Sequence, residues 1–145
     1  VAVNGGTVYA GGLFYQVGND PNANGIVKWN GANWSALGTF PLADTSPTGG
    51  QYVRSITVNN GAVYVGGLFD NPNDATMSNI AIWDGAVWTA FATGLSSDVN
   101  AIAAGLGSKM YAAGFFTTAG GDPFGNYIAQ AGANSWINYF PFVSK

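Results

Sequence analysis

The sequence predicts an all-β protein, a β-propeller segment built from three four-stranded antiparallel blades. One motif occurs three times, at Gly6–Phe14, Gly61–Phe69 and Lys109–Phe116. Each copy is surrounded by short strand-like runs and tight-turn signals, and the composition, with 22 Gly and no Glu, is typical of a turn-rich β protein. Four short strands in repeats of about 40 to 50 residues are the signature of a propeller blade.

The first unit reads as a four-stranded meander. Its first apolar run ends at Asn4-Gly5, a dipeptide that favours a tight hairpin with positive φ at both central positions. A polar loop over Gly18–Asn24 follows the second strand, and Asn30-Gly31 marks another tight turn. The strands are expected at Val1–Val3, Thr7–Ala10, Gly25–Trp29 and Asn33–Leu37.

Two further units follow, with all length variation in the connections. A Pro- and Gly-rich connection from Gly38 to Tyr52 is expected to be a surface loop, and a shorter link runs from Ala92 to Asp98. The second unit is expected to have strands at Ser55–Val58, Ala62–Val65, Asn79–Trp83 and Val87–Phe91. The third is expected to have them at Val99–Ala103, Lys109–Ala113, Asn126–Gln130 and Ser135–Tyr139. The three blades are therefore predicted over residues 1–40, 53–92 and 98–140.

The landmarks within each unit keep a constant spacing. From the motif tyrosine to the fourth-strand tryptophan the interval is 25, 24 and 25 residues, for the pairs Tyr9 and Trp34, Tyr64 and Trp88, and Tyr111 and Trp136. The third unit lacks one landmark, because Ala131 stands where the others have Trp29 and Trp83.

These residues resemble a known family. The pattern Tyr-x-Gly-Gly-x-Phe, then a loop, then Asn-Ile-Ala-x-Trp-Asp-Gly-x-x-Trp spans Tyr64–Phe69 and Asn79–Trp88. It resembles the Kelch-like, delta-sixty-type β-propeller repeats of secreted bacterial and other surface proteins, and Phe116–Gly121 is similar to that family's stretch after the second strand. The resemblance covers almost the whole chain. Because the matching residues are packing and turn residues, it implies a fold and says little of activity.

Composition narrows the classes of partner and location. Charged residues make up 8% of the chain, and four scattered bases against seven acids offer no basic face for nucleic acid. There is no long apolar run that would predict a membrane span. A surface rich in Asn, Ser, Thr and Gly favours an extracellular or cell-surface location. The start at Val1, inside a pattern, suggests a processed product or a segment of a longer chain.

The residue types present make an enzyme improbable. Without His or Cys, the chain cannot form a Ser-His or Cys-His nucleophile pair, or an imidazole or thiolate metal site. A pair of carboxylates could in principle hydrolyse glycosides. The seven Asp residues stand mainly in turns and loops, where Asp is common for structural reasons, so no catalytic residues are assigned.

The loops between second and third strands are the candidate binding sites. They are rich in oxygen and recur in register, and Ca²⁺ takes six to eight such ligands. The alternative is that Asp and Asn before Pro are good turn formers, and no loop matches a known calcium motif, so a metal is left undecided. The candidate residues for a ligand or partner are Asp20, Asn22, Asn24, Asp70, Asn71, Asn73, Asp74 and Asp122.

The function predicted from these features is a non-enzymatic extracellular structural or adhesive module that mediates protein–protein assembly. Its partners would be other propeller blades or copies of itself. The alternative is a carbohydrate-binding, lectin-like module, with Ca²⁺ in the oxygen-rich loops. The repeated aromatic residues are expected to fill the gaps between blades rather than to stack on sugars. The loops and long connections should share one face, opposite the tight turns.

Overall fold

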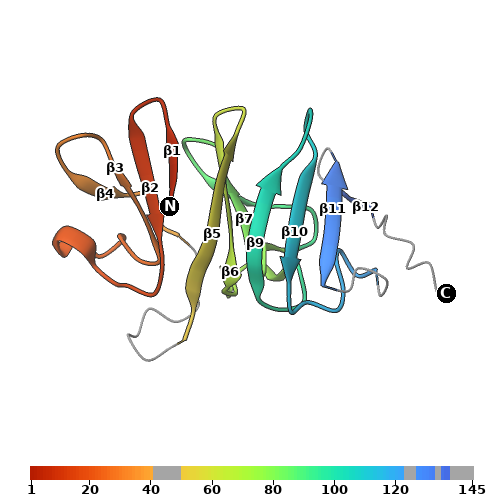
Figure 1. Ribbon diagram of the computed structural model, residues 1–145. Helices are drawn as coiled ribbons and strands as arrows, with labels where there is room; N and C mark the ends of the chain where they lie inside the picture. The colour runs from red at the N-terminus through yellow and green to blue at the C-terminus, as the bar shows by residue number, and fades with distance from the viewer. Residues whose placement is uncertain (41–49, 123–126, 133–134, 138–145) are drawn as a thin grey trace.

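The computed structural model describes residues 1–40, 50–122, 127–132 and 135–137. It is an all-β protein with three four-stranded antiparallel sheets, arranged side by side (Figure 1). The first sheet contains β1 (Ala2–Asn4), β2 (Thr7–Gly11), β3 (Ile26–Trp29) and β4 (Trp34–Ala36). The second contains β5 (Tyr52–Asn59), β6 (Ala62–Leu68), β7 (Ile80–Trp83) and β8 (Trp88–Ala90). The third contains β9 (Val99–Ala104), β10 (Met110–Gly114), β11 (Ile128–Gly132) and β12 (Ser135–Ile137).

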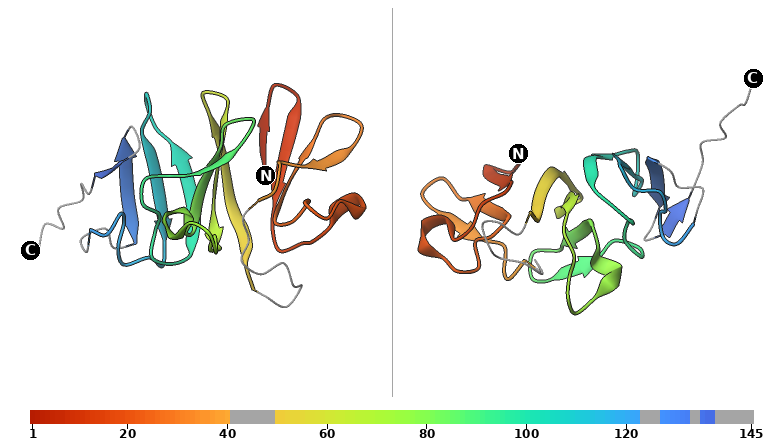
Figure 2. Two further views of the ribbon diagram at one scale, coloured as in Figure 1. Left: turned by 180° about the vertical axis from the view of Figure 1, so that it is seen from behind. Right: turned by 90° about the horizontal axis from the view of Figure 1, so that it is seen from below.

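Each sheet is a simple meander, so the strand order in space repeats the order in sequence. This confirms the expected four-stranded antiparallel unit. The first strands of neighbouring sheets contact one another, β1 with β5 and β5 with β9, and the first and fourth strands form the two edges of each sheet (Figures 1 and 2). Two short 3-10 helices, η1 (Val17–Asn19) and η2 (Ala75–Met77), lie in the loops between second and third strands. Within the described ranges, no helix has the length and apolar character needed to cross a bilayer.

The turns follow the predicted chemistry with one shift in position. In the first sheet Asn4 pairs with Thr7, so the two central residues of the hairpin are Gly5 and Gly6, rather than Asn4 and Gly5. Both glycines have positive φ, 55° and 86°. The mirror-image turn that this conformation makes matches the twist of the flanking strands, which is why glycine is favoured at both places.

Strand β5 begins earlier than predicted. The sequence assigned Tyr52 to the connection and began the strand at Ser55, but Tyr52 pairs with Leu68 and β6 continues to meet it. The register shifts between Val53 and Ser55, which leaves Arg54 as a bulge. A bulge interrupts the alternation of side chains, and this hides the start of the strand from a period-two pattern. The predicted strand residues Asn126, Asn138 and Tyr139 lie outside the described residues.

The core is divided between the two sheet-to-sheet interfaces, and one strand contributes to both. In β7, Ala81 and Trp83 belong to the cluster between the first and second sheets, whereas Ile80 belongs to the cluster between the second and third. Alternate side chains of a strand point to opposite faces, so each face of the middle sheet covers one neighbour. Phe69 and Phe116 belong to these clusters and are 1% and 0% exposed, as predicted, whereas Trp34 of the first sheet is 40% exposed.

Strand β9 is covered on one face only. The nearly continuous apolar run over Val99–Ala103 is typical of a strand covered on both faces. Val99 and Ile102 are buried, but Ala101 and Ala103 are exposed. Only one face of β9 packs against neighbouring side chains. The apolar run misled because alanine is small enough to be tolerated on an exposed face.

Candidate functional site

The two ends of the sheets differ in character. The hairpin turns between first and second strands lie together at one end, and the loops between second and third strands lie together at the other (Figure 1). The described link over 92–98 joins the loop end, where Leu95 N donates to Ser78 O and Ser96 N donates to Thr118 O. This arrangement agrees with the expected division between the tight turns and the loops, while most of the long connection over 38–52 lies outside the described residues.

In the first loop the predicted residues make local hydrogen bonds. Asp20 Oδ1 accepts a hydrogen bond of 2.9 Å from the backbone N–H of Asn22. Asn24 is 8% exposed, and its Oδ1 accepts from Gln16 N while its Nδ2 donates to Pro21 O. Both ends of the Asn24 amide are therefore bonded within its own loop, which they brace. Asn22 Oδ1 is 3.4 Å from the hydroxyl of Thr39, which links the loop to the end of the first sheet.

In the second loop the predicted residues divide between two clefts. Asp74 caps η2, because its Oδ1 accepts from the backbone N–H of Thr76 at 3.0 Å and from its hydroxyl at 2.5 Å. Asn71 Oδ1 accepts from Asn73 N at 2.9 Å, and Asn73 itself is exposed. Asp70 is exposed on the side of the third sheet, whereas Asn71 lies on the side of the first.

In the third loop Asp122 N donates to Ala119 O within a turn. In the part of the chain that the structure describes, no three side chains of His, Cys, Asp or Glu are grouped to hold a metal ion.

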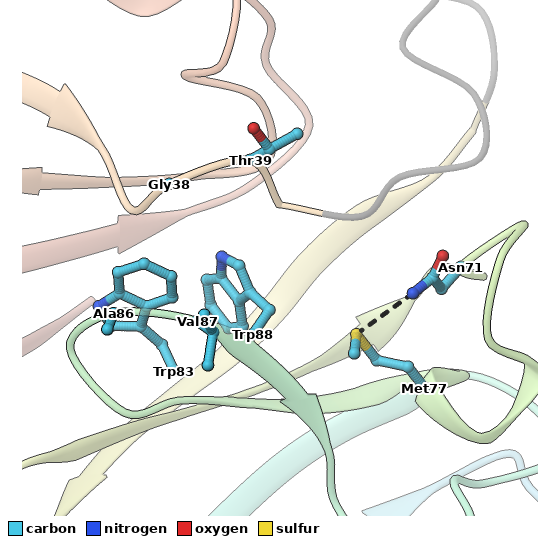
Figure 3. Close-up of a pocket in the computed structure, with 8 residues that line it drawn as sticks. All are labelled: Gly38, Thr39, Asn71, Met77, Trp83, Ala86, Val87 and Trp88. Carbon is cyan, nitrogen blue, oxygen red and sulfur yellow. Dashed lines mark hydrogen bonds between the residues drawn. The ribbon is translucent and has the colours of Figure 1, made fainter.

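A cleft of about 330 Å³ opens between the first and second sheets (Figure 3). We call it the tryptophan cleft. Its lining combines two indoles, small and apolar side chains, one amide and one hydroxyl, and none of the described residues that line it is charged. The lining residues are Gly38, Thr39, Asn71, Met77, Trp83, Ala86, Val87 and Trp88.

The two indoles are placed by a hairpin and by the neighbouring sheet. Trp83 ends β7 and Trp88 begins β8, and they are direct cross-strand partners with ring centroids 5.4 Å apart. Trp88 Nε1 donates a hydrogen bond of 2.6 Å to Leu37 O in the first sheet. Gly38, next in the chain, has φ +61°, and a Cβ there would lie 2.8 Å from Trp83 Cη2. The end of the first sheet therefore fits closely against the indoles, and only a residue without a side chain allows it.

A second cleft of about 240 Å³ lies between the loops of the second and third sheets. Its lining is mostly polar, and Asp70 is the one charged residue among the described residues that line it. Asn79 organises this region from beneath: it is 4% exposed, its Oδ1 accepts from Phe69 N, and its Nδ2 donates to Leu95 O at 2.8 Å. The polar side chains that line it are Asp70, Ser78, Asn79, Thr93, Ser96 and Thr118.

A polar cluster at the loop end joins the first strands of the second and third sheets. Tyr52 Oη donates to Asp98 Oδ2 at 2.7 Å, and Arg54 Nη1 donates to Asn100 Oδ1 at 2.7 Å. Arg54 also lies 4.9 Å from the centroid of the Tyr52 ring and 3.4 Å from Asp98 Oδ2. Burial, the hydrogen bond to Asp98 and the negative charge of its carboxylate raise the pKa of Tyr52 above 10.0, against the opposing effect of Arg54. Sequence reasoning missed this cluster, because Arg54 looked like one of four scattered bases.

No protein-family model matches the chain, and no curated protein matches it. The three sheets can still be compared with one another. Trp83, which needs Gly38 opposite, corresponds to Ala131 in the third sheet, and Gly38 corresponds to Ala92, which also has positive φ. Where the third sheet has Ala131 in place of a tryptophan, the second sheet can therefore have the larger Ala92 in place of the glycine.

Proposed function

We propose that this chain is a non-enzymatic structural module of β-propeller blades that assembles through the faces of its sheets. The single observation that carries the proposal is an exposed apolar face on the first sheet. We call it the leading face. It consists of Val1, Val3, Trp29 and Trp34, whose counterparts in the second sheet are Ile56, Val58, Trp83 and Trp88.

Among these counterparts, Trp83 belongs to the core cluster between the first and second sheets. Ile56, Val58 and Trp88 pack against that cluster. On the leading face, by contrast, Val1 is 82% exposed, Val3 66% and Trp34 40%. The pair Trp29 and Trp34 already holds the geometry of the docked pair, with ring centroids 5.4 Å apart at 48°, compared with 5.4 Å at 45° for Trp83 and Trp88. The leading face is therefore preformed to receive a sheet.

The occupant that fits is the trailing face of another four-stranded sheet. The first sheet shows what such a face offers, namely the Leu37 carbonyl for an indole N–H and a left-handed glycine beside it. An exposed apolar patch of this kind marks an interaction surface. A further sheet of the same type, contributed by another copy of this chain, would cover it.

The residue composition supports a structural role at the outside of the cell. With no His or Cys, most nucleophile and metal templates have no side chain to use. A surface of Asn, Ser, Thr and Gly with 8% charged residues is more familiar in extracellular proteins. We therefore propose an extracellular or cell-surface location.

Analytical ultracentrifugation of the purified 145-residue chain across micromolar concentrations tests the assembly. We expect a concentration-dependent associated species, and we expect Trp34→Glu to abolish it by placing a charge in the contact. Leu106→Glu is the matched control, because Leu106 is 92% exposed on the β9–β10 hairpin and away from the leading face. A well-folded wild-type monomer at all concentrations, or equal association in Trp34→Glu, would overturn the proposal.

A further inference from the structure

We propose that the tryptophan cleft binds the ring of a neutral saccharide. This inference concerns a site distinct from the leading face and does not depend on assembly. It begins from the lining: two aromatic rings, one amide and one hydroxyl border a volume of about 330 Å³, and no lining residue within the described ranges is charged. Small-molecule sites commonly have about 300 Å³ or more, a largely apolar lining and a few placed polar groups.

The cleft has an aromatic side and a polar rim. Trp83 and Trp88 lie side by side, Thr39 lies above them, and Asn71 stands to one side next to Met77 (Figure 3). Trp83 is only 8% exposed, and the Phe40 ring packs edge-on against Trp88 with 4.6 Å between ring centroids. The apolar surface open to solvent therefore belongs to the partly exposed Trp88 and to Val87, which is 54% exposed. A ligand held here would contact apolar carbon atoms on one side and hydrogen-bonding groups at its edge.

A pyranose ring has this division of surface. Its C–H groups form apolar faces, which pack on the electron-rich face of an indole, and its hydroxyls radiate from the edge. The Trp88 indole N–H is already bonded to Leu37 O, so this side chain offers a ligand its ring rather than its donor. Aromatic contact and hydrogen bonding are therefore supplied by different residues.

The polar groups of the rim retain capacity for a hydroxyl ligand. The Asn71 amide has two N–H donors and an oxygen with two lone pairs. Its Oδ1 accepts one hydrogen bond, from Asn73 N, and its Nδ2 lies 3.7 Å from Met77 Sδ, a weak acceptor. The Thr39 hydroxyl donates weakly to Asn22 Oδ1 at 3.4 Å and keeps its lone pairs. Amide and hydroxyl groups can each donate and accept, as sugar hydroxyls do.

The lining residues that the structure describes carry no charge, which favours a neutral sugar. A charged ligand would lose its hydration without meeting an opposite charge among the lining residues, which is costly. An entirely apolar ligand would leave the Asn71 amide without water or a partner on that side. A neutral hexose or hexosamide unit satisfies both sides, with an expected Kd on the order of 1 mM for a single ring.

Saturation-transfer NMR with the methyl pyranosides of glucose, galactose, mannose and N-acetylglucosamine tests the site directly. We expect transfer to the ring C–H protons of at least one glycoside. Asn71→Ala should weaken binding about tenfold, because it removes a hydrogen-bonding group from the rim. Asn73→Ala is the matched control: Asn73 lies in the same loop outside the cleft, and the backbone N–H that it gives to Asn71 is kept.

Thr39→Val serves as a second variant, since it removes only the hydroxyl and its fold can be checked by circular dichroism. We expect it to weaken binding while Trp34→Glu, on the leading face, leaves binding unchanged. Binding that is equal in wild type, Asn71→Ala and Thr39→Val would overturn the proposal. So would the absence of transfer to all four glycosides, or equal binding of cyclohexylmethanol, which shares the ring shape but has a single hydroxyl.

Discussion

Trp88 donates its indole N–H to the carbonyl oxygen of Leu37 across 2.6 Å, and this hydrogen bond joins two sheets that share no strand. We expect Trp88→Phe to destabilise the fold by about 1 to 3 kcal/mol, because it keeps an aromatic ring but leaves the Leu37 carbonyl without its donor. Chemical denaturation measures the change. Trp34→Phe is the matched control, since Trp34 has no such acceptor among the described residues, and its effect should stay near zero. An equal loss in both variants would show that ring size, rather than the hydrogen bond, matters.

Gly38 leaves the space that the Trp83 ring occupies between the first and second sheets. We expect Gly38→Ala to cost about 1 to 3 kcal/mol, because the added Cβ would lie 2.8 Å from the Trp83 ring and overpack the interface. Gly5→Ala isolates the cost of positive φ alone, since Gly5 has φ +55° and open space around its Cβ position. In the background of Trp83→Ala, Gly38→Ala should cost little more than Gly5→Ala does. Strict additivity of the two substitutions in a double-mutant cycle would contradict this relationship.

Tyr52 should make the stability depend on alkaline pH. Its pKa is raised in the folded protein above 10.0, so the folded state holds the proton more strongly than the unfolded state does. The stabilisation is therefore complete below pH 10 and is lost as pH rises through the folded pKa. We expect the melting temperature of the wild type to fall more steeply above pH 10 than that of Tyr52→Phe. At neutral pH, Tyr52→Phe should cost about 1 to 3 kcal/mol, because Asp98 loses a donor. Parallel pH profiles of the two proteins would contradict the assignment.

Asp84 should respond at the acidic end. Its Oδ1 accepts from the backbone N–H groups of Ala86 and Val87, both at 2.8 Å, and these bonds lower the pKa of Asp84 below 3.8. The turn is therefore stabilised above pH 3.8, and this is lost as pH falls through the lower folded value. We expect the amide signals of Ala86 and Val87 to move together in that range. Asp84→Asn is the matched control, because an asparagine side chain does not titrate and Asn30, at this position of the first sheet, makes the same two hydrogen bonds. In that variant the two amide signals should not move with pH.

The strands and turns could be predicted from the sequence because their causes are local. Alternating apolar residues and the residues with positive φ, such as Asn60 and Gly61, lie within a few positions of the elements that they define. The start of β5 could not, because the pairing of Tyr52 with Leu68 depends on a bulge at Arg54.

The candidate sites were predictable only in part. Asn71 was among the expected ligand residues, but its cleft also needs Thr39 from the first sheet, which no local pattern brings near. Asn24 was also among the expected ligand residues, and its amide oxygen and nitrogen are hydrogen-bonded within its own loop. The oxygen content of a loop predicts its turns well, whereas the direction in which each oxygen points depends on how the sheets pack.

The alternation in β7 limits how the sequence can vary in length. Ile80 packs in one sheet-to-sheet interface, and Ala81 and Trp83 pack in the other. Inserting one residue into the strand would therefore turn the side chains beyond it to the opposite face and exchange the two interfaces. Such an insertion acts like a frameshift, with effects far beyond its position. Deletions and additions can accumulate without this penalty only where the chain leaves the sheets. This restriction explains why the sequence interval from the motif tyrosine to the fourth-strand tryptophan is nearly constant, whereas the connections between sheets differ in length.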